Sequence, residues 1–366
     1  KTSSGASSSR SVGGINLQNA IYNGANGTYG SGSYYGMSSL SSRYYSEYRF
    51  TSVAGELNSK FGKVQNTLRG TYSFQDQPRS NEYGNQPIIE FVMNDGQDHY
   101  PTWALTGDVF TMGNLSQTKN IVLTDELTMT LGNHHLFGGI QFEKNKAVNG
   151  YAQAAAGYYA YEVTAEEAAA GNWDAVFARD PRVFAITYGN NDAHSMFSAK
   201  MSTNQWSFYL QDNMNLSDNF KLSAGVRFEL PSYPSLKNNY NKDYFDLSFG
   251  GNHYRTDQVP GGSVSFSPRV GFNWDLTGER KYVLRGGTGL FVGRMPFVWL
   301  VSAVGNSGMG QTSYVATTEN KKTMPSFTMS QSDMLQQINA TSSTSIPTGP
   351  TIMADDLRMP KTWKGS

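Results

Sequence analysis

Hydrophobic and polar residues alternate with a period of two along much of the chain from Arg43 onward. In the segment 220–230, every even position is apolar and every odd position is polar or glycine. The segment 264–276 repeats this pattern. A period of two predicts β-strands with one apolar and one polar face. The apolar face would lie against a protein core in a soluble sandwich and against lipid in a membrane barrel, and periodicity fits both.

The alternation predicts about eight strands, arranged as four hairpins. Their expected ranges are 43–57, 61–75, 116–131, 135–147, 203–216, 219–231, 264–276 and 280–293. Short turns are expected within the hairpins, at Asn58–Lys60, Gly132–His134, Ser217–Asp218 and Thr277–Glu279. Between the hairpins lie the long connections 76–115, 148–202 and 232–263.

Short turns that alternate with long loops are typical of a bacterial outer-membrane barrel, with periplasmic turns and extracellular loops. We therefore expect an all-β fold, a segment of an antiparallel transmembrane β-barrel. Residues 1–42 are rich in Ser, Gly and Tyr and predict a surface loop or flexible arm. Residues 43–293 would form the barrel hairpins. Residues 294–366 would form a long extracellular loop that leads to a further strand beginning near Lys361.

Composition narrows the functional classes. The chain has 366 residues, with 29 basic and 29 acidic side chains, which argues against a nucleic-acid partner. It has no cysteine, which excludes disulfides, thiolate metal sites and a cysteine nucleophile. No stretch has the run of about 18 apolar residues that a transmembrane helix needs. The first nine residues lack the apolar core of a signal peptide, so processing, or an origin inside a larger protein, is expected.

No constellation of residues indicates catalysis. There is no G-x-S-x-G motif, and the glycines at 286–289 lie in a strand pattern with no helix after them. His134 and His135 fall in a predicted turn, where solvated histidines are more common than metal ligands. Asn94–Asp98 resembles a calcium loop without its later glutamate, so calcium stays open. We expect no enzyme activity, no catalytic residue, no metal site and no cofactor.

The loops carry many aromatic residues that could contact a ligand at a pore mouth or simply pack the loops together. The candidates for ligand contact are Tyr151, Tyr158, Tyr159, Trp173, Tyr240, Tyr244 and Tyr254. Within the longest loop, Thr164 and Glu167 fit a capping box and predict a short helix that ends at Gly171.

Charged residues on the polar strand faces would point into a barrel lumen. They are Arg69, Glu143, Arg227, Glu229, Arg269, Asp275 and Arg285. They could contact substrate or a plug, or they could form ion pairs with one another, which a polar lumen needs to satisfy its own charges.

Two hairpins echo one another in sequence. Residues 123–143 (LTDELTMTLGNHHLFGGIQFE) and 210–229 (LQDNMNLSDNFKLSAGVRFE) align with one residue inserted at the turn. In both, an aspartate, Asp125 or Asp212, falls in the apolar register. A position near a membrane interface would accommodate such a charge.

The string FYLQDNMNLSDNFKLSAGVRFE at 208–229 resembles a hairpin of TonB-dependent receptors. FSPRVGFNWD at 266–275 and RGGTGLFVGRMP at 285–296 resemble the strands that follow it. The combination is most similar to the Oar-like branch of these receptors in Bacteroidetes, and less similar to the SusC branch. The resemblance is specific over 206–296, looser over 43–148, and includes no TonB box, plug domain or terminal aromatic strand.

That resemblance implies an internal fragment of an outer-membrane transporter that imports a large nutrient ligand. It implies a plug domain, the TonB complex and outer-membrane lipid as partners, and it leaves a surface lipoprotein partner open. The ligand is left open. The alternative is a β-rich bacterial surface protein that adheres through its Tyr-rich loops.

Overall fold

Three β-sheets make up the structure, a computed structural model that describes residues 2–4, 37–38, 44–81, 84–94, 99–105, 112–193, 195–341, 345–347 and 349–366. The segment 1–42, expected to be a loop or arm, lies outside the described residues except for β1 (Thr2–Ser4) and β2 (Met37–Ser38). The expectation for that segment is therefore untested.

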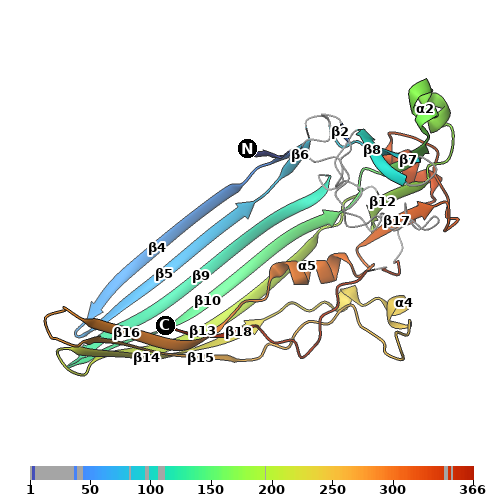
Figure 1. The fold of residues 1–366 in the computed structure, drawn as a ribbon. Coiled ribbons are helices and arrows are strands. Elements are labelled where there is room, and N and C mark those ends of the chain that lie inside the picture. Colours follow the sequence, from blue (N-terminus) through green and yellow to red (C-terminus); the bar gives the residue numbers. More distant parts are fainter. Residues whose placement is uncertain are drawn as a thin grey trace.

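A nine-stranded sheet forms the body of the molecule, and its long strands run side by side in Figure 1. Its strands follow chain order, and all neighbours are antiparallel. They are β4 (Arg49–Phe61), β5 (Val64–Asp76), β9 (Gly113–Leu131), β10 (His134–Ala152), β13 (Ala199–Asn215), β14 (Phe220–Ser232), β15 (Ser265–Asp275), β16 (Val283–Val292) and β18 (Lys361–Gly365). The first eight form the four expected hairpins, and β18 is a ninth strand in this sheet. The sheet does not close, because β4 and β18 are its two outermost strands.

The first hairpin turn differs from the prediction. We expected it at Asn58–Lys60, but Phe61 pairs with Val64, so the turn lies at Gly62 and Lys63. Gly62 has a φ of 62°, a conformation that glycine adopts at no steric cost. The period-two pattern continues through 58–60, so a glycine marks this turn better than a group of polar residues does.

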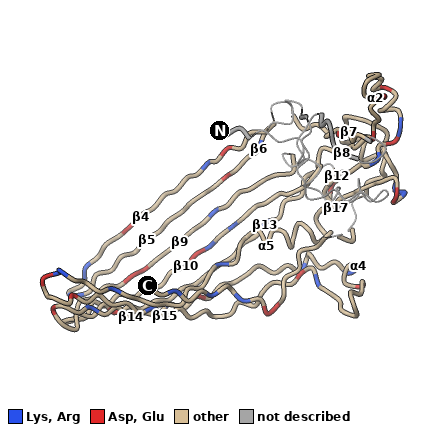
Figure 2. The backbone as a smooth tube through the Cα atoms, in the orientation of Figure 1, with Lys and Arg blue, Asp and Glu red and all other residues tan. Residues whose placement is uncertain are grey.

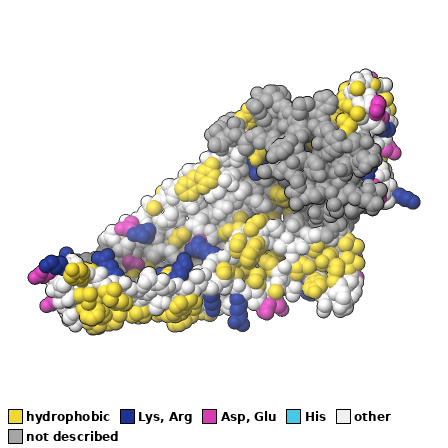
Figure 3. Space-filling model, in the orientation of Figure 1, with side chains coloured by type: hydrophobic (Ala, Val, Ile, Leu, Met, Phe, Trp, Pro, Cys, Tyr) yellow, Lys and Arg dark blue, Asp and Glu magenta, His cyan; other side chains and the backbone are white. Residues whose placement is uncertain are grey.

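The two faces of this sheet differ in chemistry. The outer face carries exposed apolar side chains, among them Leu57, Leu210 and Val270, with exposed fractions of 60%, 57% and 48%. Cross-strand partners keep the pattern, since Phe228 lies directly opposite Phe266. Hydrophobic side chains gather on the visible surface near the short turns (Figure 3). An exposed apolar face of this extent needs a non-aqueous environment.

The echo between the two hairpins has a packing cause on the inner face. Gly139 lies opposite Tyr209, and a Cβ on Gly139 would come within 2.7 Å of that hydroxyl. Gly225 is the equivalent glycine of the other hairpin, and its Cβ would meet Gln211 at 2.9 Å. In both hairpins glycine leaves room for a long side chain on the neighbouring strand.

Parts of the connections 76–115 and 148–202, with a segment after α5 (Phe297–Gly305) and β2, form a second sheet of six strands, which we call the loop sheet. Its order is β17 (Gln311–Thr317), β12 (Val183–Gly189), β11 (Tyr158–Val163), β7 (Ile88–Asn94), β8 (His99–Leu105) and β2. β7 and β11 are parallel, although segments far apart in the chain supply them. We had expected these connections to be loops with one helix, so the loop sheet is a correction.

Two short helices, α3 (Trp173–Phe177) and α6 (Gln331–Gln337), pack on the loop sheet, and a third, α2 (Ala165–Ala170), is exposed at its edge. The predicted capping box is confirmed, because Thr164 and Glu167 bond to one another's backbone N–H, and Gly171 ends the helix in the left-handed conformation. The Arg179 side chain, followed by the Thr164 N–H, lowers the pKa of Glu167. The side chains of Thr164 and Glu167 therefore satisfy backbone N–H groups at the start of α2.

The remaining elements are smaller. α4 (Lys242–Phe245) and the 3₁₀ helix η3 (Lys237–Asn239) lie in the connection after β14, and β1, β3 (Tyr44–Ser46) and β6 (Arg79–Asn81) form a three-stranded sheet. α5 (Phe297–Gly305) lies along β10 and β13 (Figure 1). None of the described helices is long and apolar enough to cross a membrane.

Candidate functional site

Polar side chains on the inner face of the nine-stranded sheet bind one another. Arg227 donates to Glu229 at 3.1 Å and reaches across β13 to the side-chain Oε1 of Gln141 at 2.7 Å. Its guanidinium lies 5.5 Å from the ring centre of Tyr209, whose hydroxyl donates to Glu126 at 2.7 Å. This arrangement satisfies buried polar groups within the protein.

By register, all seven charged residues predicted to face inward lie on this face, but their partners differ. Arg69 pairs with Glu56 across β4 and β5 at 2.5 Å. The Arg269 guanidinium lies over the Phe291 ring at 4.6 Å. Arg285 lies opposite Asn273 in the register. These residues therefore do not form one continuous network of ion pairs.

Asp275 has a different role from the expected ion pair. Its carboxylate accepts hydrogen bonds from the backbone N–H groups of Thr277, Gly278 and Arg280. These bonds close the turn between β15 and β16. The residue stabilises a turn, as aspartate commonly does.

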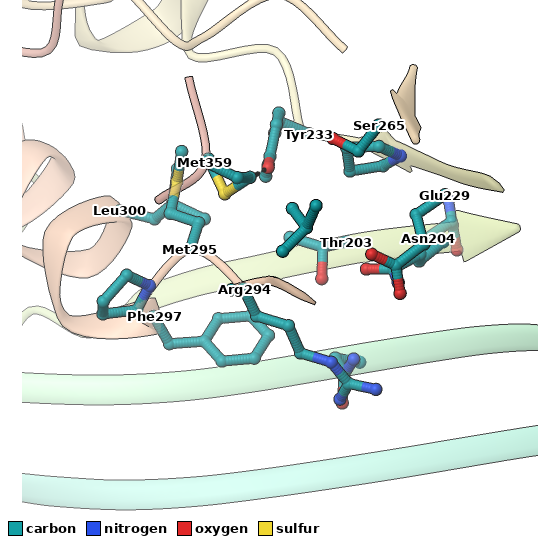
Figure 4. Close-up of a pocket in the computed structure, with 16 residues that line it drawn as sticks. Thr203, Asn204, Glu229, Tyr233, Ser265, Arg294, Met295, Phe297, Leu300 and Met359 are labelled. Atoms are coloured by element: carbon teal, nitrogen blue, oxygen red, sulfur yellow. Dashed lines mark hydrogen bonds between the residues drawn. The ribbon is translucent and has the colours of Figure 1, made fainter. Parts of the chain in front are cut away.

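A cavity of about 330 Å³ opens on the inner face beside the segment that leads from β16 into α5. We call it the Arg294 cavity. Figure 4 shows Met295, Leu300 and Met359 at one end and Glu229 and Asn204 at the other. The cavity therefore has an apolar end and a polar end.

At the polar end, the Oδ1 atom of Asn204 is buried out of reach of solvent and has no hydrogen-bond partner among the described residues. Glu229 accepts from Gln205 at 3.3 Å in addition to Arg227. At the apolar end, the Tyr233 hydroxyl donates to the Met359 sulfur at 3.3 Å, and burial raises the pKa of Tyr233. Such a mixture of apolar wall and few polar groups is typical of a binding cavity.

An ion pair connects the start of α5 to the nine-stranded sheet. Arg294 lies 2.6 Å from Glu143 on β10, whose side chain is 5% exposed. Glu143 also accepts from Asn120 at 3.0 Å and from Asn145 at 2.8 Å. The charge of Glu143 is thus fully paired, and Arg294 links β16 to a strand four places away in the sheet.

α5 itself packs on the inner face through apolar contacts. Leu300, Val301 and Val304 are buried against Met201 and Ala147 of the wall. The other side of the helix exposes Val298 and Trp299, at 59% and 42%. The helix carries no charged residue, so apolar burial and the Arg294 ion pair hold it in place.

Two of the aromatic residues proposed for ligand contact prove to be core residues. Tyr158 and Tyr159 lie in β11 at the centre of the loop sheet, and both have an exposed fraction of 0%. Tyr159 packs on Phe184 at 5.0 Å between ring centres. Burial raises the pKa of Tyr159 to about 12. Their rings cannot reach a ligand, and a continuous apolar run such as YYAY is typical of a fully buried strand.

The other proposed aromatics divide by exposure. Trp173 packs against Phe91 at 4.9 Å, and Tyr244 is 7% exposed. Arg255 covers the ring of Tyr240 at 4.6 Å. Tyr151 and Tyr254 are 50% and 42% exposed. Only these last two of the seven present a large part of their ring to the surroundings.

A buried carboxyl group accompanies Tyr158. Glu90 on β7 is 1% exposed and accepts a hydrogen bond of 2.8 Å from the Tyr158 hydroxyl. Burial raises the pKa of Glu90 to about 8, against the smaller opposing effect of that hydrogen bond. Burial therefore favours the protonated, neutral form of Glu90.

The described part of the chain contains no group of three His, Asp or Glu that could hold a metal ion. Of the possible calcium loop, Asp95–Asp98 lies outside the described residues, so that hypothesis is untested. His134 and His135 are the first residues of β10 rather than part of a turn, and His134 contacts Asp212.

Arg294, Met295, Phe297, Tyr233 and Met359 line the cavity but were not identified from the sequence. We had assigned 294–366 to a loop. A signal was present, because the uncharged run FVWLVSAVG directly after Pro296 is typical of a buried helix. The missed residues lie at the ends of that helix and of neighbouring strands.

Comparisons with known proteins add a family and a structural likeness. The sequence profile of the outer membrane beta barrel domain family matches residues 18–364. The crystal structure of the outer membrane transporter YddB from Escherichia coli aligns with a TM-score of 0.47 and 11% identity, over 76% of this chain and 29% of that one. The chain thus spans 29% of the length of that transporter. No curated protein matches the chain.

The family match accounts for the exposed apolar face of the antiparallel sheet, which lies against lipid. The match covers nearly the whole chain, including the nine-stranded sheet and α5. The chain belongs to the outer membrane β-barrel domain family, and its place is the outer membrane.

Proposed function

We propose that this chain forms part of the wall and the extracellular loop domain of a TonB-dependent transporter that binds and imports a large solute. In this proposal the long-loop end, with the loop sheet, faces outward, and the short turns face the periplasm. The inner face of the nine-stranded sheet then lines the lumen. A plug domain and the TonB complex would be the partners of the parent protein.

The observation that carries the proposal is the Arg294 cavity on a sheet that is still open at nine strands. Barrels of about eight strands fill their interior with side chains, whereas wider barrels leave a lumen. Here α5 and a cavity of about 330 Å³ occupy the inner face near the long loops. A solute that enters past the loops would pass this cavity on its way along the lumen.

The distribution of charge agrees with a conduit. Charged residues are sparse along the strands and gather near the ends of the sheet and around α2 (Figure 2). Some of those on the inner face are paired with neighbours, as in the Arg227–Glu229 pair. A charge that is already paired interacts only weakly with a passing solute.

The test is depletion of solutes from the medium by a strain that carries the full-length gene, compared with a deletion strain. Mass spectrometry of the spent medium identifies the solutes without a prior choice of ligand. We expect at least one large solute to be depleted only by the strain with the gene, and dissipation of the proton gradient to stop its depletion. Equal depletion by both strains, with loss of attachment to surfaces in the deletion strain, would replace transport by adhesion.

A further inference from the structure

A second cavity lies on the inner face of the nine-stranded sheet, between the Arg294 cavity and the short turns. It has a volume of about 490 Å³ and is lined mainly by residues of β14, β15, β16 and β18. We call it the Arg269 cavity, after a residue of β15 that lines it. It lies on the turn side of the Arg294 cavity, because Ser265, which lines that cavity, precedes Arg269 on a strand that runs towards its short turn.

Two long basic side chains flank a glycine in the Arg269 cavity. Arg269 lies directly opposite Gly289, and Gly289 lies directly opposite Lys364 on β18. The Arg269 guanidinium lies 4.6 Å from the centre of the Phe291 ring, and the Lys364 ammonium lies 5.7 Å from the same centre. Two like charges are therefore held close together, near one aromatic ring.

No carboxylate of the described chain neutralises these two cations. The described residues that line the cavity include no Asp or Glu, and neither Arg269 nor Lys364 forms an ion pair with a described residue. Asp275, the one acidic residue of β15, accepts from backbone N–H groups of its own turn. By contrast, Arg227 and Arg294 on the same face each pair with a glutamate. A cavity lined by charges of one sign attracts ions of the other sign.

Glycines form the floor of the cavity and keep it open. Gly271 on β15 lies directly opposite Gly287 on β16. A Cβ on Gly271 would meet only the Gly286 carbonyl oxygen, at an ordinary 3.6 Å, and its φ is not positive, so neither packing nor backbone conformation requires glycine there. Glycine weakens a strand and often marks a position that a ligand approaches closely. This open space lies beside the two unpaired cations.

The floor favours a small anion over a peptide. β15 and β16 each have a hydrogen-bonded neighbour on both sides, so the backbone groups of the floor are already paired. A polypeptide laid on this floor would find no backbone partner there, and its own N–H and C=O groups would need other partners. A carboxylate or phosphate needs only the two cations, because Arg and Lys both donate to its oxygens.

We propose that the Arg269 cavity binds an acidic group of the solute, a carboxylate or a phosphate, between Arg269 and Lys364 and over Gly271. The proposal names the class of solute as anionic, and it rests on the proposed function for the statement that the solute is imported. Binding of the anion does not depend on import.

The experiment follows acetylation of Lys364 by a water-soluble reagent in the full-length protein in detergent, measured by peptide mass spectrometry. The probes are citrate and inorganic phosphate, each compared with sodium chloride at equal ionic strength, and glucose is the uncharged control. We expect citrate, phosphate or both to slow the acetylation at least threefold, and the stronger of the two identifies the acidic group. Lys237 should react equally in all conditions, because it is exposed in η3 and does not line the cavity.

Gly271→Val tests the cavity without removing a charge, because the new side chain would occupy the space over the floor. We expect the anions no longer to protect Lys364 in this variant. Gly55→Val is the matched control, since a Cβ on Gly55 meets nothing within 4 Å and Gly55 lies on the same outer face of β4 as Leu57. If Gly271→Val does not yield the compact band of a folded barrel on an unboiled gel, Arg269→Gln takes its place, with the same expected loss of protection.

Several results would overturn the site. They are equal acetylation of Lys364 with and without the anions, equal protection by glucose, and protection that persists in the folded variants. A protein carboxylate as the partner of Lys364 would also overturn it. In that case Lys364 would react slowly without any added anion, and a carbodiimide, which joins an amine to a carboxylate in contact with it, would couple Lys364 to an Asp or Glu of the parent protein.

Failure of the site and failure of transport are distinguishable. If the strain with the gene depletes a solute but the anions do not protect Lys364, transport stands and the site falls. If the anions protect Lys364 but neither strain depletes any solute selectively, the site stands and transport falls. Where both hold, the depleted solutes should carry carboxylate or phosphate groups, and depletion of uncharged solutes alone would overturn the assignment of the solute class.

Discussion

Oδ2 of Asp212 lies 2.6 Å from Nδ1 of His134 on the outer, apolar face of neighbouring strands β13 and β10. Asp212 lies directly opposite Leu136, so His134 is its diagonal neighbour, two residues closer to the turn. The other echo hairpin repeats the arrangement, because Asn66 on β5 donates to Asp125 at 2.5 Å and is diagonal to it in the same way. Both aspartates are therefore explained by a donor on the preceding strand.

The His134→Ala variant tests this pairing. It leaves the Asp212 carboxylate without its partner on a face that lies against lipid, which should lower the free energy of unfolding by about 1–3 kcal/mol. The measurement is urea unfolding in lipid vesicles, followed by the loss of the compact band on unboiled gels. In the double variant with Asp212→Asn, most of the loss should be recovered. Equal stability of His134→Ala and the unmodified protein would show that the contact contributes nothing.

The Gly139→Ala variant tests the close approach of Tyr209. Its Cβ would lie 2.6 Å from the Asp125 carbonyl and 2.7 Å from the Tyr209 hydroxyl, so Tyr209 must move and its bond to Glu126 must lengthen. Overpacking of this kind lowers stability by about 1–3 kcal/mol. Gly55→Ala on β4 is the control, because its Cβ would meet nothing within 4 Å. The expectation fails if both variants unfold at the same urea concentration.

The Arg294→Ala variant removes the link between α5 and Glu143. Glu143 keeps its hydrogen bonds from Asn120 and Asn145, so the loss of stability should be modest, about 1 kcal/mol. The local effect is larger, because the segment before α5 loses its only ion pair to β10 among the described residues. Amides of 297–305 should exchange hydrogen faster than in the unmodified protein, while those of β10 should not. Uniform acceleration across the sheet would contradict a local role.

Glu90 makes the loop sheet sensitive to pH. Its pKa of about 8 in the folded chain exceeds the ordinary value of 4.5, so the folded state binds the extra proton. The resulting stabilisation is complete below pH 4.5 and is lost progressively as the pH rises to about 8. Limited proteolysis should cut the loop sheet faster at pH 9 than at pH 6. In Glu90→Gln this difference should vanish, and a persistent difference would assign the effect to another group.

The Thr164→Ala variant should affect only α2. Loss of the hydrogen bond to the Glu167 backbone typically costs a helix about 1 kcal/mol. Because α2 is exposed at the edge of the loop sheet, we expect faster hydrogen exchange within 165–170 and an unchanged unfolding midpoint. Thr164→Ser retains the hydroxyl and serves as the control, with exchange close to that of the unmodified protein.

The hairpins of the barrel wall were predictable because a strand between water and lipid must alternate at every residue. The short turns followed from the same pattern, except the first, where alternation continues past Asn58 to Phe61. The capping box of α2 was predictable because it depends on residues only three positions apart. Each of these features is local in sequence.

The loop sheet was not predictable in the same way. Its pairing of Val183 with Thr317 joins segments far apart in the chain, and no local pattern specifies such a partner. The strand VFAITYG is buried at all seven positions. Its continuous apolar run indicates a core strand, but we had assigned this segment to a loop. The Arg294–Glu143 pair depends on the curvature of the sheet, which residue spacing does not define.

The matching glycines, aspartates and glutamates of β9–β10 and β13–β14 have a consequence for how such walls evolve. In each hairpin a glycine leaves room for a side chain of the neighbouring strand. The aspartate of each hairpin accepts a hydrogen bond from a residue on the preceding strand. Duplication of the gene segment for one hairpin would therefore insert a pair of strands that already fit their neighbours. The barrel would gain two strands. Duplication of a single strand would reverse the direction of every later strand, so that later short turns would lie at the end where the long loops now lie. This is consistent with the even strand numbers of bacterial barrels.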